Sequence, residues 1–236
     1  MIFLLDDEPN APFPDVSLAE RDPNGLLAVG GDLSEQRLIN AYLQGIFPWF
    51  SEGEPILWWS PDPRTVLYPD RIKISRSLRK VLRKKAFQVS FDHDFLAVIQ
   101  ACAAPRERSP GTWLLPEMMT AYHRQYQLGL AHSVEVWQDG ELVGGLYGMA
   151  IGGVFFGESM FSRVSDSSKV ALVHLSRCLD SWGYKMIDCQ VYTQHLATLG
   201  AEEIPRARYC RQLAEWTRLP GRGGNWADIA IGHPEV

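Results

Sequence analysis

The sequence predicts an α+β protein with a small, loop-rich N-terminal domain and a larger C-terminal domain of regular structure. Prolines and glycines crowd the first 63 residues, whereas helix and strand periodicities follow one another from residue 64 onward. The composition, 46% hydrophobic and 22% charged, is that of a globular protein that can bury a core. We therefore expect one domain at residues 1–63 and a second at 64–236.

One helix is predicted in the N-terminal domain. Apolar side chains recur at helical spacing from Leu38 to Leu43, with Asp32 or Ser34 as the cap and Gly45 as the end. The remainder of this domain, including its tryptophans, reads as irregular segments and turns.

The C-terminal domain begins with short helices and continues with strands. The predicted helices lie at residues 75–85, 94–103 and 116–128. The predicted strands lie at residues 133–137, 142–150 and 154–159. The first two strands are joined by a hairpin turn at Asp139-Gly140.

A longer amphipathic helix follows these strands. Asp166 or Ser165 can cap it, and Gly183 ends it. Its apolar stripe consists of Ala171, Leu172, Leu175, Leu179 and Trp182. Residues 185–191 then form a strand whose mostly apolar character predicts a buried position.

Missing signals exclude several classes of function. The sequence has no P-loop, GxSxG or HExxH motif, which argues against an ATP-driven ligase and a serine hydrolase. The four cysteines lack CxxC spacing, so we expect reduced thiols, no metal and no cofactor. No signal peptide and no run near the ~18–20 apolar residues of a membrane span are present, so we expect a cytoplasmic protein without a membrane partner.

Basic charge is concentrated in one short segment of a chain whose net charge is −5. Residues 71–85 hold eight of the 23 basic residues and no acid, and Arg76, Lys80, Arg83 and Lys84 share one helix face. Like charges at this spacing destabilise a helix, and polyphosphate would compensate them. We favour a nucleic-acid contact; a solvated face, or an acidic protein or membrane partner, are the alternatives.

The strand at residues 186–191 places polar side chains in apolar company. Alternation puts Ile187, Cys189 and Val191 on one face and directs Asp188 and Gln190 together to the other. A buried carboxylate needs partners, because its unpaired burial costs several kcal/mol. The pair is either the polar floor of a cleft or a core aspartate satisfied by backbone donors, and the residues alone favour neither.

Glu158 is the single acid in the aromatic segment 154–162, where Ser162 supplies a hydroxyl. Such a glutamate suggests recognition of an amine or a ribose hydroxyl, although a strand-edge or capping carboxylate is equally compatible.

Trp49 and Trp113 occur in loop-like contexts. Exposed tryptophans can stack on bases for ~1–3 kcal/mol per base, although most tryptophans simply fill a core.

A series of ordered segments between about residues 12 and 213 shares one resemblance. They are residues 24–33, 45–51, 56–64, 75–78, 111–113, 131–137, 142–148, 156–162, 187–190 and 199–206. Together they resemble the bacterial leucyl/phenylalanyl-tRNA–protein transferases. The departures are small: Lys73 stands where the family usually has His, Ser109-Pro110 is a short insertion, and Asp166 opens a segment that usually contains alanine.

The resemblance implies an activity and a fold. The larger domain would have a GNAT-like (acetyltransferase-like) fold. The enzyme would move Leu or Phe, with Met as a weaker donor, from aminoacyl-tRNA to proteins that begin with Arg or Lys, and so mark them for degradation. An aminoacyl ester is already activated, so neither ATP nor metal is required. We expect a monomer.

The resemblance also implies roles for residues. Asp188 would be an electrostatic anchor and Gln190 a positioning group for the attacking amine; Trp49 and Trp113 would hold the terminal adenosine; Glu158 and Ser162 would bind nearby polar groups. The donor pocket would consist of Phe155, Met160, Leu172, Leu175 and Leu179. The tRNA backbone would contact Arg76, Arg79, Lys80, Arg83 and Lys84.

Two rival functions remain open at this point. One is an acetyl-CoA-dependent N-acetyltransferase of the same fold, although the stretch after Val143 lacks the glycine pattern that cradles a pyrophosphate. The other is a tRNA-binding adaptor without catalytic activity.

Overall fold

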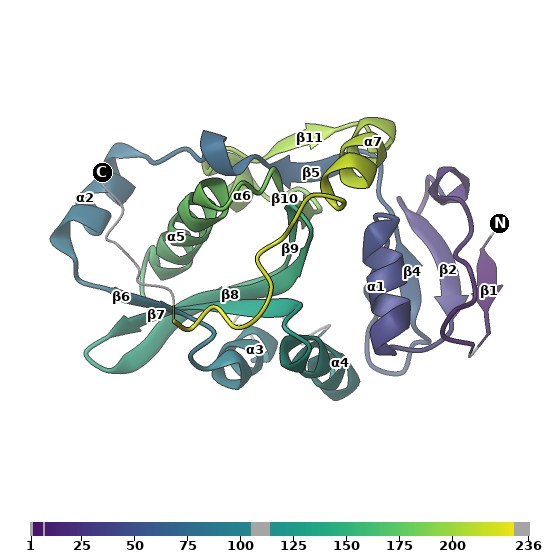
Figure 1. The fold of residues 1–236 in the computed structure, drawn as a ribbon, viewed down its shortest axis with the longest axis horizontal. Coiled ribbons are helices and arrows are strands. Elements are labelled where there is room, and N and C mark those ends of the chain that lie inside the picture. The colour runs from purple at the N-terminus through teal and green to yellow at the C-terminus, as the bar shows by residue number, and fades with distance from the viewer. Residues whose placement is uncertain (1, 7, 105–113, 229–236) are drawn as a thin grey trace.

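The computed structural model describes residues 2–6, 8–104 and 114–228. Within these ranges the chain forms two β-sheets, a small one near the N terminus and a larger one that is covered by helices (Figure 1). The α+β prediction is confirmed.

The N-terminal sheet has four strands among the described residues, in the order β1-β2-β4-β3. The strands are β1 (Phe3–Leu5), β2 (Leu26–Gly30), β3 (Phe47–Pro48) and β4 (Leu57–Trp59). Trp58 is fully buried on β4 and packs edge-on against Phe13 at 4.9 Å between ring centroids. The segment that the sequence suggests is irregular therefore contains a sheet, and the tryptophans of β4 belong to it.

Helix α1 (Glu35–Leu43) forms as the sequence predicts, and it packs beside this sheet (Figure 1). Ser34, and not Asp32, is the cap, since its side chain accepts the backbone N–H of Arg37. The Arg37 side chain is fully buried and binds the Asp32 carboxylate at 3.1 Å. A short 3₁₀ turn, η1 (Val16–Leu18), precedes β2.

The larger sheet has seven strands in the described part of the chain, in the order β11-β5-β10-β9-β8-β7-β6. The strands are β5 (Arg64–Leu67), β6 (Gln88–Phe91), β7 (Ala131–Gln138), β8 (Glu141–Ile151), β9 (Val154–Ser162), β10 (Met186–Gln190) and β11 (Glu202–Ile204). All neighbours pair antiparallel except β9 and β10. These two pair in parallel over only three residues each, Val154–Phe156 with Met186–Asp188.

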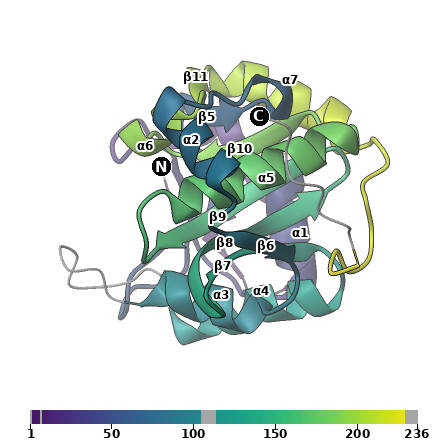
Figure 2. The same cartoon turned by 90° about the vertical axis from the view of Figure 1, so that its left-hand side faces the viewer.

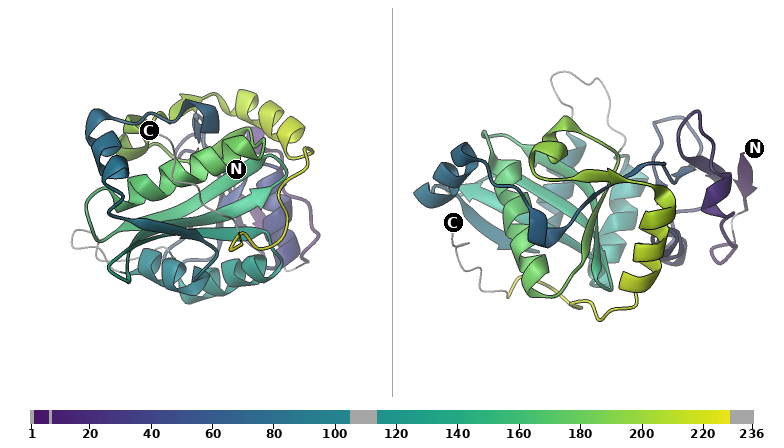
Figure 3. Two further views of the ribbon diagram at one scale, coloured as in Figure 1. Left: turned by 60° about the vertical axis from the view of Figure 1, so that its left-hand side comes forward. Right: turned by 90° about the horizontal axis from the view of Figure 1, so that it is seen from above.

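Helices cover both faces of the larger sheet. They are η2 (Pro69–Arg71), α2 (Arg76–Lys84), α3 (Phe95–Ala103), α4 (Pro116–Gln127), α5 (Ser167–Ser181), α6 (Gln194–Thr198) and α7 (Arg206–Trp216). Figures 2 and 3 show α5, with α2 beside it, on one face, and α3 and α4 on the other. No helix within the described ranges is long and apolar enough to cross a membrane.

The predicted helices and strands of the larger domain agree with the structure to within a few residues at each end. The start of α5 differs from the prediction in one respect, its capping hydrogen bond. Asp166 holds the N-cap position of α5, but its carboxylate binds Lys169 at 2.7 Å and makes no capping hydrogen bond. The elements without a predicted counterpart in this domain are β5, β6, β11, η2, α6 and α7; all but α7 are short.

Candidate functional site

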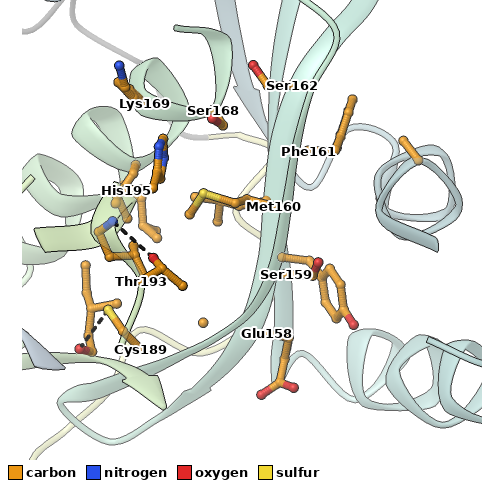
Figure 4. A pocket seen from close by; sticks show the side chains of 18 of the residues that line it. Glu158, Ser159, Met160, Phe161, Ser162, Ser168, Lys169, Cys189, Thr193 and His195 are labelled. Atoms are coloured by element: carbon orange, nitrogen blue, oxygen red, sulfur yellow. Dashed lines mark hydrogen bonds between the residues drawn. The ribbon is translucent and has the colours of Figure 1, made fainter. Parts of the chain in front are cut away.

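A cavity of about 1180 Å³ lies where β9 and β10 part. Because these strands stop pairing after Phe156 and Asp188, a space opens beyond that point and side chains line it. The walls come from β9, the first half of α5, the end of β10, and α6. Figure 4 shows Met160 reaching from β9 into this space, with Glu158 toward one end of the strand and Ser162 toward the other.

Glu158 forms the polar end of the cavity and is tied to three other side chains. The hydroxyl of Tyr42 donates to its Oε1 at 2.6 Å, and the hydroxyl of Tyr122 donates to its Oε2 at 2.7 Å. The amide of Gln190 donates to Oε1 at 2.9 Å. Tyr42 comes from α1 and Tyr122 from α4, so the N-terminal and C-terminal parts of the chain share this carboxylate.

Burial controls the ionisation of this cluster. Desolvation raises the pKa of Glu158 to about 7, although the hydrogen bonds from Tyr42 and Tyr122 oppose the rise. Burial and the nearby carboxylate together raise the pKa values of both tyrosines well above the ordinary value, so both remain hydroxyl donors. At neutral pH, Glu158 can therefore exchange between acid and carboxylate, as a group that moves protons must.

Tyr147 adds spare hydrogen-bonding capacity to the same region. It lines the cavity, it packs edge-on against Tyr122 at 5.4 Å, and its side chain is fully buried. Its hydroxyl has no hydrogen-bond partner among the described residues. A buried hydroxyl without a partner is costly, so a polar group of a bound substrate would stabilise it.

Asp188 lies behind the cavity and does not line it. Its carboxylate makes a two-pronged ion pair with Arg64, from Nε at 2.8 Å and from Nη2 at 2.7 Å. The hydroxyl of Tyr209 donates a further hydrogen bond at 2.7 Å, and the backbone N–H of Gln190 another at 2.9 Å. Burial alone would lower the pKa of Arg64, but the Asp188 carboxylate raises it above its ordinary value.

The sequence left open whether Asp188 and Gln190 form the floor of a cleft or Asp188 is a satisfied core carboxylate, and the structure divides the pair: Asp188 is fully buried away from the cavity, whereas Gln190 borders it. The apolar side chains of Ile187, Cys189 and Val191 border the cavity too. The strand is irregular between Asp188 and Gln190, and Gln190 has a left-handed backbone with φ of 63°. This break in the alternation turns Gln190 back toward Glu158 while Asp188 stays on the far side, with Arg64.

Four of the five residues assigned to the donor pocket line this cavity. Phe155, Met160, Leu172 and Leu175 line the cavity, and Ser162 borders it with its hydroxyl bonded to Ser167 and the Val164 carbonyl. Leu179 does not line it. It is fully buried in the core beneath α5, because it lies nearly two turns beyond Leu172 along the helix.

The two tryptophans assigned to the adenosine are not among the lining residues. Trp49 is 44% exposed in the N-terminal sheet region, where its ring lies 5.8 Å from that of Trp59. Such an exposed ring suits a stacking role outside the cavity. Trp113 lies outside the described residues.

The basic residues of α2 all face solvent. Leu78 is buried against the core, and the exposed residues are Arg76, Arg79, Lys80, Arg83 and Lys84. The amphipathic character of this helix is therefore as the sequence predicts. Among the described residues no cluster of His, Cys, Asp and Glu has the arrangement of a metal site.

Five side chains of the site are not among the sequence-based candidates: Arg64, Tyr42, Tyr122, Tyr147 and Tyr209. Tyr42 was visible only as part of an apolar helix stripe. The others join the site through contacts between distant segments, such as the 124 positions that separate Arg64 from Asp188. The strongest sequence signal was Arg64 itself, a charged residue that ends a proline-rich matching segment.

Known proteins match most of the chain. A family model described as "Leucyl/phenylalanyl-tRNA protein transferase" matches residues 66–214, and one for the N-terminal domain of the same proteins matches residues 31–62. The leucyl/phenylalanyl-tRNA–protein transferase of Nitrosomonas europaea is 59% identical over 217 residues, 92% of each chain. That of Nitrosospira multiformis is 60% identical, over 91% of this chain and 92% of its own.

One solved structure is a much more distant likeness. It is a GCN5-related N-acetyltransferase from Kribbella flavida, 13% identical, with a TM-score of 0.38 over 68% of this chain and 57% of its own.

A cavity with apolar walls and a titratable polar end, on a mixed α/β fold, is typical of enzymes that hold an organic substrate. The curated relatives are transferases, and they are similar to this chain over nearly its whole length. The chain belongs to the leucyl/phenylalanyl-tRNA protein transferase family.

Proposed function

We propose that this protein transfers Leu or Phe, and more weakly Met, from aminoacyl-tRNA to proteins that begin with Arg or Lys. The observation that carries the proposal is the cavity between β9 and β10, whose apolar walls meet a buried carboxylate and amide. Family membership supports the donor and the reaction. The acceptor's basic first residue comes from the resemblance, and the product would be marked for degradation.

The donor's side chain occupies the apolar part of the cavity in this proposal. Phe155, Met160, Leu172 and Leu175 supply its walls. An apolar pocket distinguishes side chains by only ~1–3 kcal/mol per methylene. Met160 is unbranched and adapts its shape easily, which fits a pocket that accepts Leu, Phe and Met together.

The reaction exchanges an ester bond for an amide bond. The acceptor's neutral α-amine attacks the ester carbonyl carbon, the bond to the ribose oxygen breaks, and the proton lost by nitrogen ends on that oxygen. The amine must be held within ~3–3.5 Å of the carbonyl. Glu158 borders the cavity and burial raises its pKa to about 7, so we assign it to accept the amine's proton, with return to the ribose oxygen directly or through the ribose 2′-hydroxyl.

Gln190 and Asp188 then have different tasks. Gln190 borders the cavity and positions the amine beside Glu158, since a neutral amide is a poor base. Asp188 acts through its neighbours. With Arg64 and Tyr209 it fixes the backbone N–H of Gln190, and so holds the left-handed turn that aims this side chain.

The remaining assignments concern the RNA and the setting. The exposed basic face of α2 contacts the phosphate backbone, and Trp49 and Trp113 hold the terminal adenosine. The protein works as a cytoplasmic monomer without a cofactor. Residues 1–63 and 64–236 act as two domains; the separate family matches on either side of residue 63 support this division.

The direct test gives the protein labelled Leu-tRNA and labelled acetyl-CoA in separate reactions with the same Arg-initiated peptide. We expect label to join the peptide's N terminus only from Leu-tRNA. Transfer only from acetyl-CoA would establish the N-acetyltransferase instead. Binding of tRNA without any product would establish an adaptor.

A further inference from the structure

The segment after α7 returns across the end of the larger sheet and buries a tryptophan there. Figure 2 shows this segment, in yellow, running along one side of the molecule from α7 to the level of β7 and α4. Trp226 is fully buried at its end. The segment lies beyond residue 214, where the family match ends, so the match assigns it no role.

Trp226 is held by polar and stacking contacts at once. Its backbone N–H donates to Asp92 Oδ2 at 2.8 Å, and the same oxygen binds His132 Nδ1 at 2.8 Å. The indole stacks on the His132 ring with centroids 3.6 Å apart and planes within 2°. The indole N–H closes the segment on itself through the Arg222 carbonyl at 3.2 Å.

The indole also supports a wall of the cavity. Its ring lies 6.2 Å from the ring of Phe155, which lines the cavity and is itself almost completely buried. Phe155 therefore borders the cavity and also lies against Trp226, which does not line it. Since protein interiors are close-packed, the position of the Phe155 ring depends on what lies behind it.

We propose that Trp226 is a positioning residue for donor choice: residues 219–228 form a strap whose tryptophan fixes the Phe155 wall and so limits the depth of the donor pocket. This proposal rests on the proposed function. Removing the indole leaves a void into which the Phe155 ring can retreat, because a core relaxes part of the way into a cavity. The pocket then deepens, which favours the larger donor side chain.

The test compares Trp226→Ala and Trp226→Phe with the unaltered full-length protein. Leu-tRNA and Phe-tRNA compete for one Arg-initiated peptide, and the ratio of the two products gives the ratio of kcat/KM values. We expect the Phe-to-Leu ratio to rise about tenfold in Trp226→Ala, the size of effect that one methylene has in an apolar pocket. Trp226→Phe leaves a smaller void, so its shift has the same direction and a smaller size.

Val136→Ala is the matched control. Val136 is fully buried in the same apolar cluster as Trp226 but does not line the cavity. Its loss lowers the melting temperature and leaves the donor ratio unchanged. If the Trp226 variants lose activity equally with both donors, the ratio stays the same and Trp226 is only structural. Either that result or a fall in the ratio overturns the proposal. Should Trp226→Ala fail to fold, Trp226→Phe decides between the two outcomes.

A second pair of variants tests the route through Phe155. Phe155→Leu should raise the ratio by itself, and Trp226→Ala added to it should change the ratio no further, because the ring that retreats is gone. Independent, additive shifts would contradict the proposed route. An unaltered protein that transfers neither amino acid would instead overturn the proposed function, so the two failures are distinguishable.

Discussion

At the scale of single residues, Glu158 is a buried carboxyl group that borders the cavity. Burial raises its pKa to about 7, and the hydroxyls of Tyr42 and Tyr122 limit that rise by donating to the carboxylate. A carboxylate that titrates near neutrality suits proton transfer from an amine. The tyrosines therefore tune the group to which we assign the proton transfer.

Tyr122→Phe should move the pH dependence of transfer to higher pH. The variant loses one donor to Glu158, which raises the pKa of the carboxyl further, so the active carboxylate appears later as pH rises. Single-turnover rates across neutral pH measure this. The acceptor's own α-amine, with a pKa near 7.7–8.0, contributes equally with both enzymes, so only the difference between the profiles reports Glu158. Superimposable profiles would contradict the assignment.

Glu158 also links stability to pH. Its pKa in the folded protein is raised, so its contribution to stability is fully present below the ordinary value of 4.5 and is lost as pH rises through about 7. Glu158→Gln cannot ionise. We expect the free energy of unfolding of Glu158→Gln, minus that of the unaltered protein, to increase by up to about 3 kcal/mol between acid and alkaline pH. Denaturant unfolding across pH measures the difference, and a constant gap would refute it.

Asp188→Ala should unfold more easily and lose transfer while tRNA binding persists. It leaves Arg64 buried without a counter-charge, at a cost of about 3–5 kcal/mol. Tyr209→Phe is the milder control, since it removes one hydrogen bond and keeps the ion pair, for about 1 kcal/mol. Thermal melts, transfer rates and tRNA affinity separate the effects. A large loss of RNA affinity in a folded Asp188→Ala protein would assign Asp188 to binding.

At the scale of elements, β10 shows how far a sequence pattern leads and where it stops. The polar pair Asp188 and Gln190 was recognisable, because polar side chains interrupt a buried strand. The directions of these two side chains were not predictable in the same way. Strict alternation assumes a regular strand, whereas the irregularity before Gln190 depends on contacts with Arg64 and Glu158 from other parts of the chain.

The helices were more predictable for a physical reason. The periodicities that define α2, α3 and α4, and the serine that caps α2, are local in sequence. The cavity walls on β9 and α5 were assigned through the family resemblance and not from local patterns; of these residues Leu179, which continues the apolar stripe of α5, lies past the end of the cavity. The tyrosine cluster around Glu158 has no local signature, since its members come from α1, α4 and β9.

Helix α2 carries a prediction about the RNA. Neutralising Arg76, Lys80 and Arg83 should make tRNA affinity less dependent on salt. The slope of log affinity against log salt concentration should become shallower by ~0.7–0.9 for each phosphate contact that is lost. A control variant should neutralise three exposed basic residues elsewhere in the chain: Lys185, Arg211 and Arg218. Binding titrations at several salt concentrations compare the slopes. An α2 variant with the slope of the control would place the RNA elsewhere.

At the scale of the whole molecule, the site depends on both sheets. Tyr42 reaches Glu158 from the N-terminal part, and the Gly45 carbonyl accepts a hydrogen bond at 3.1 Å from Arg64, the partner of Asp188. The larger sheet supplies the parted strands. We therefore propose that the small N-terminal part supports the chemistry and also offers a surface to the RNA.

The most direct test is a structure of the protein with a non-hydrolysable aminoacyl-adenosine analogue. We expect its leucyl or phenylalanyl side chain between β9 and α5, in contact with Met160 and Leu172, and its carbonyl near Gln190 and Glu158. The analogue bound outside this cavity, or with its side chain directed away from these walls, would contradict the account.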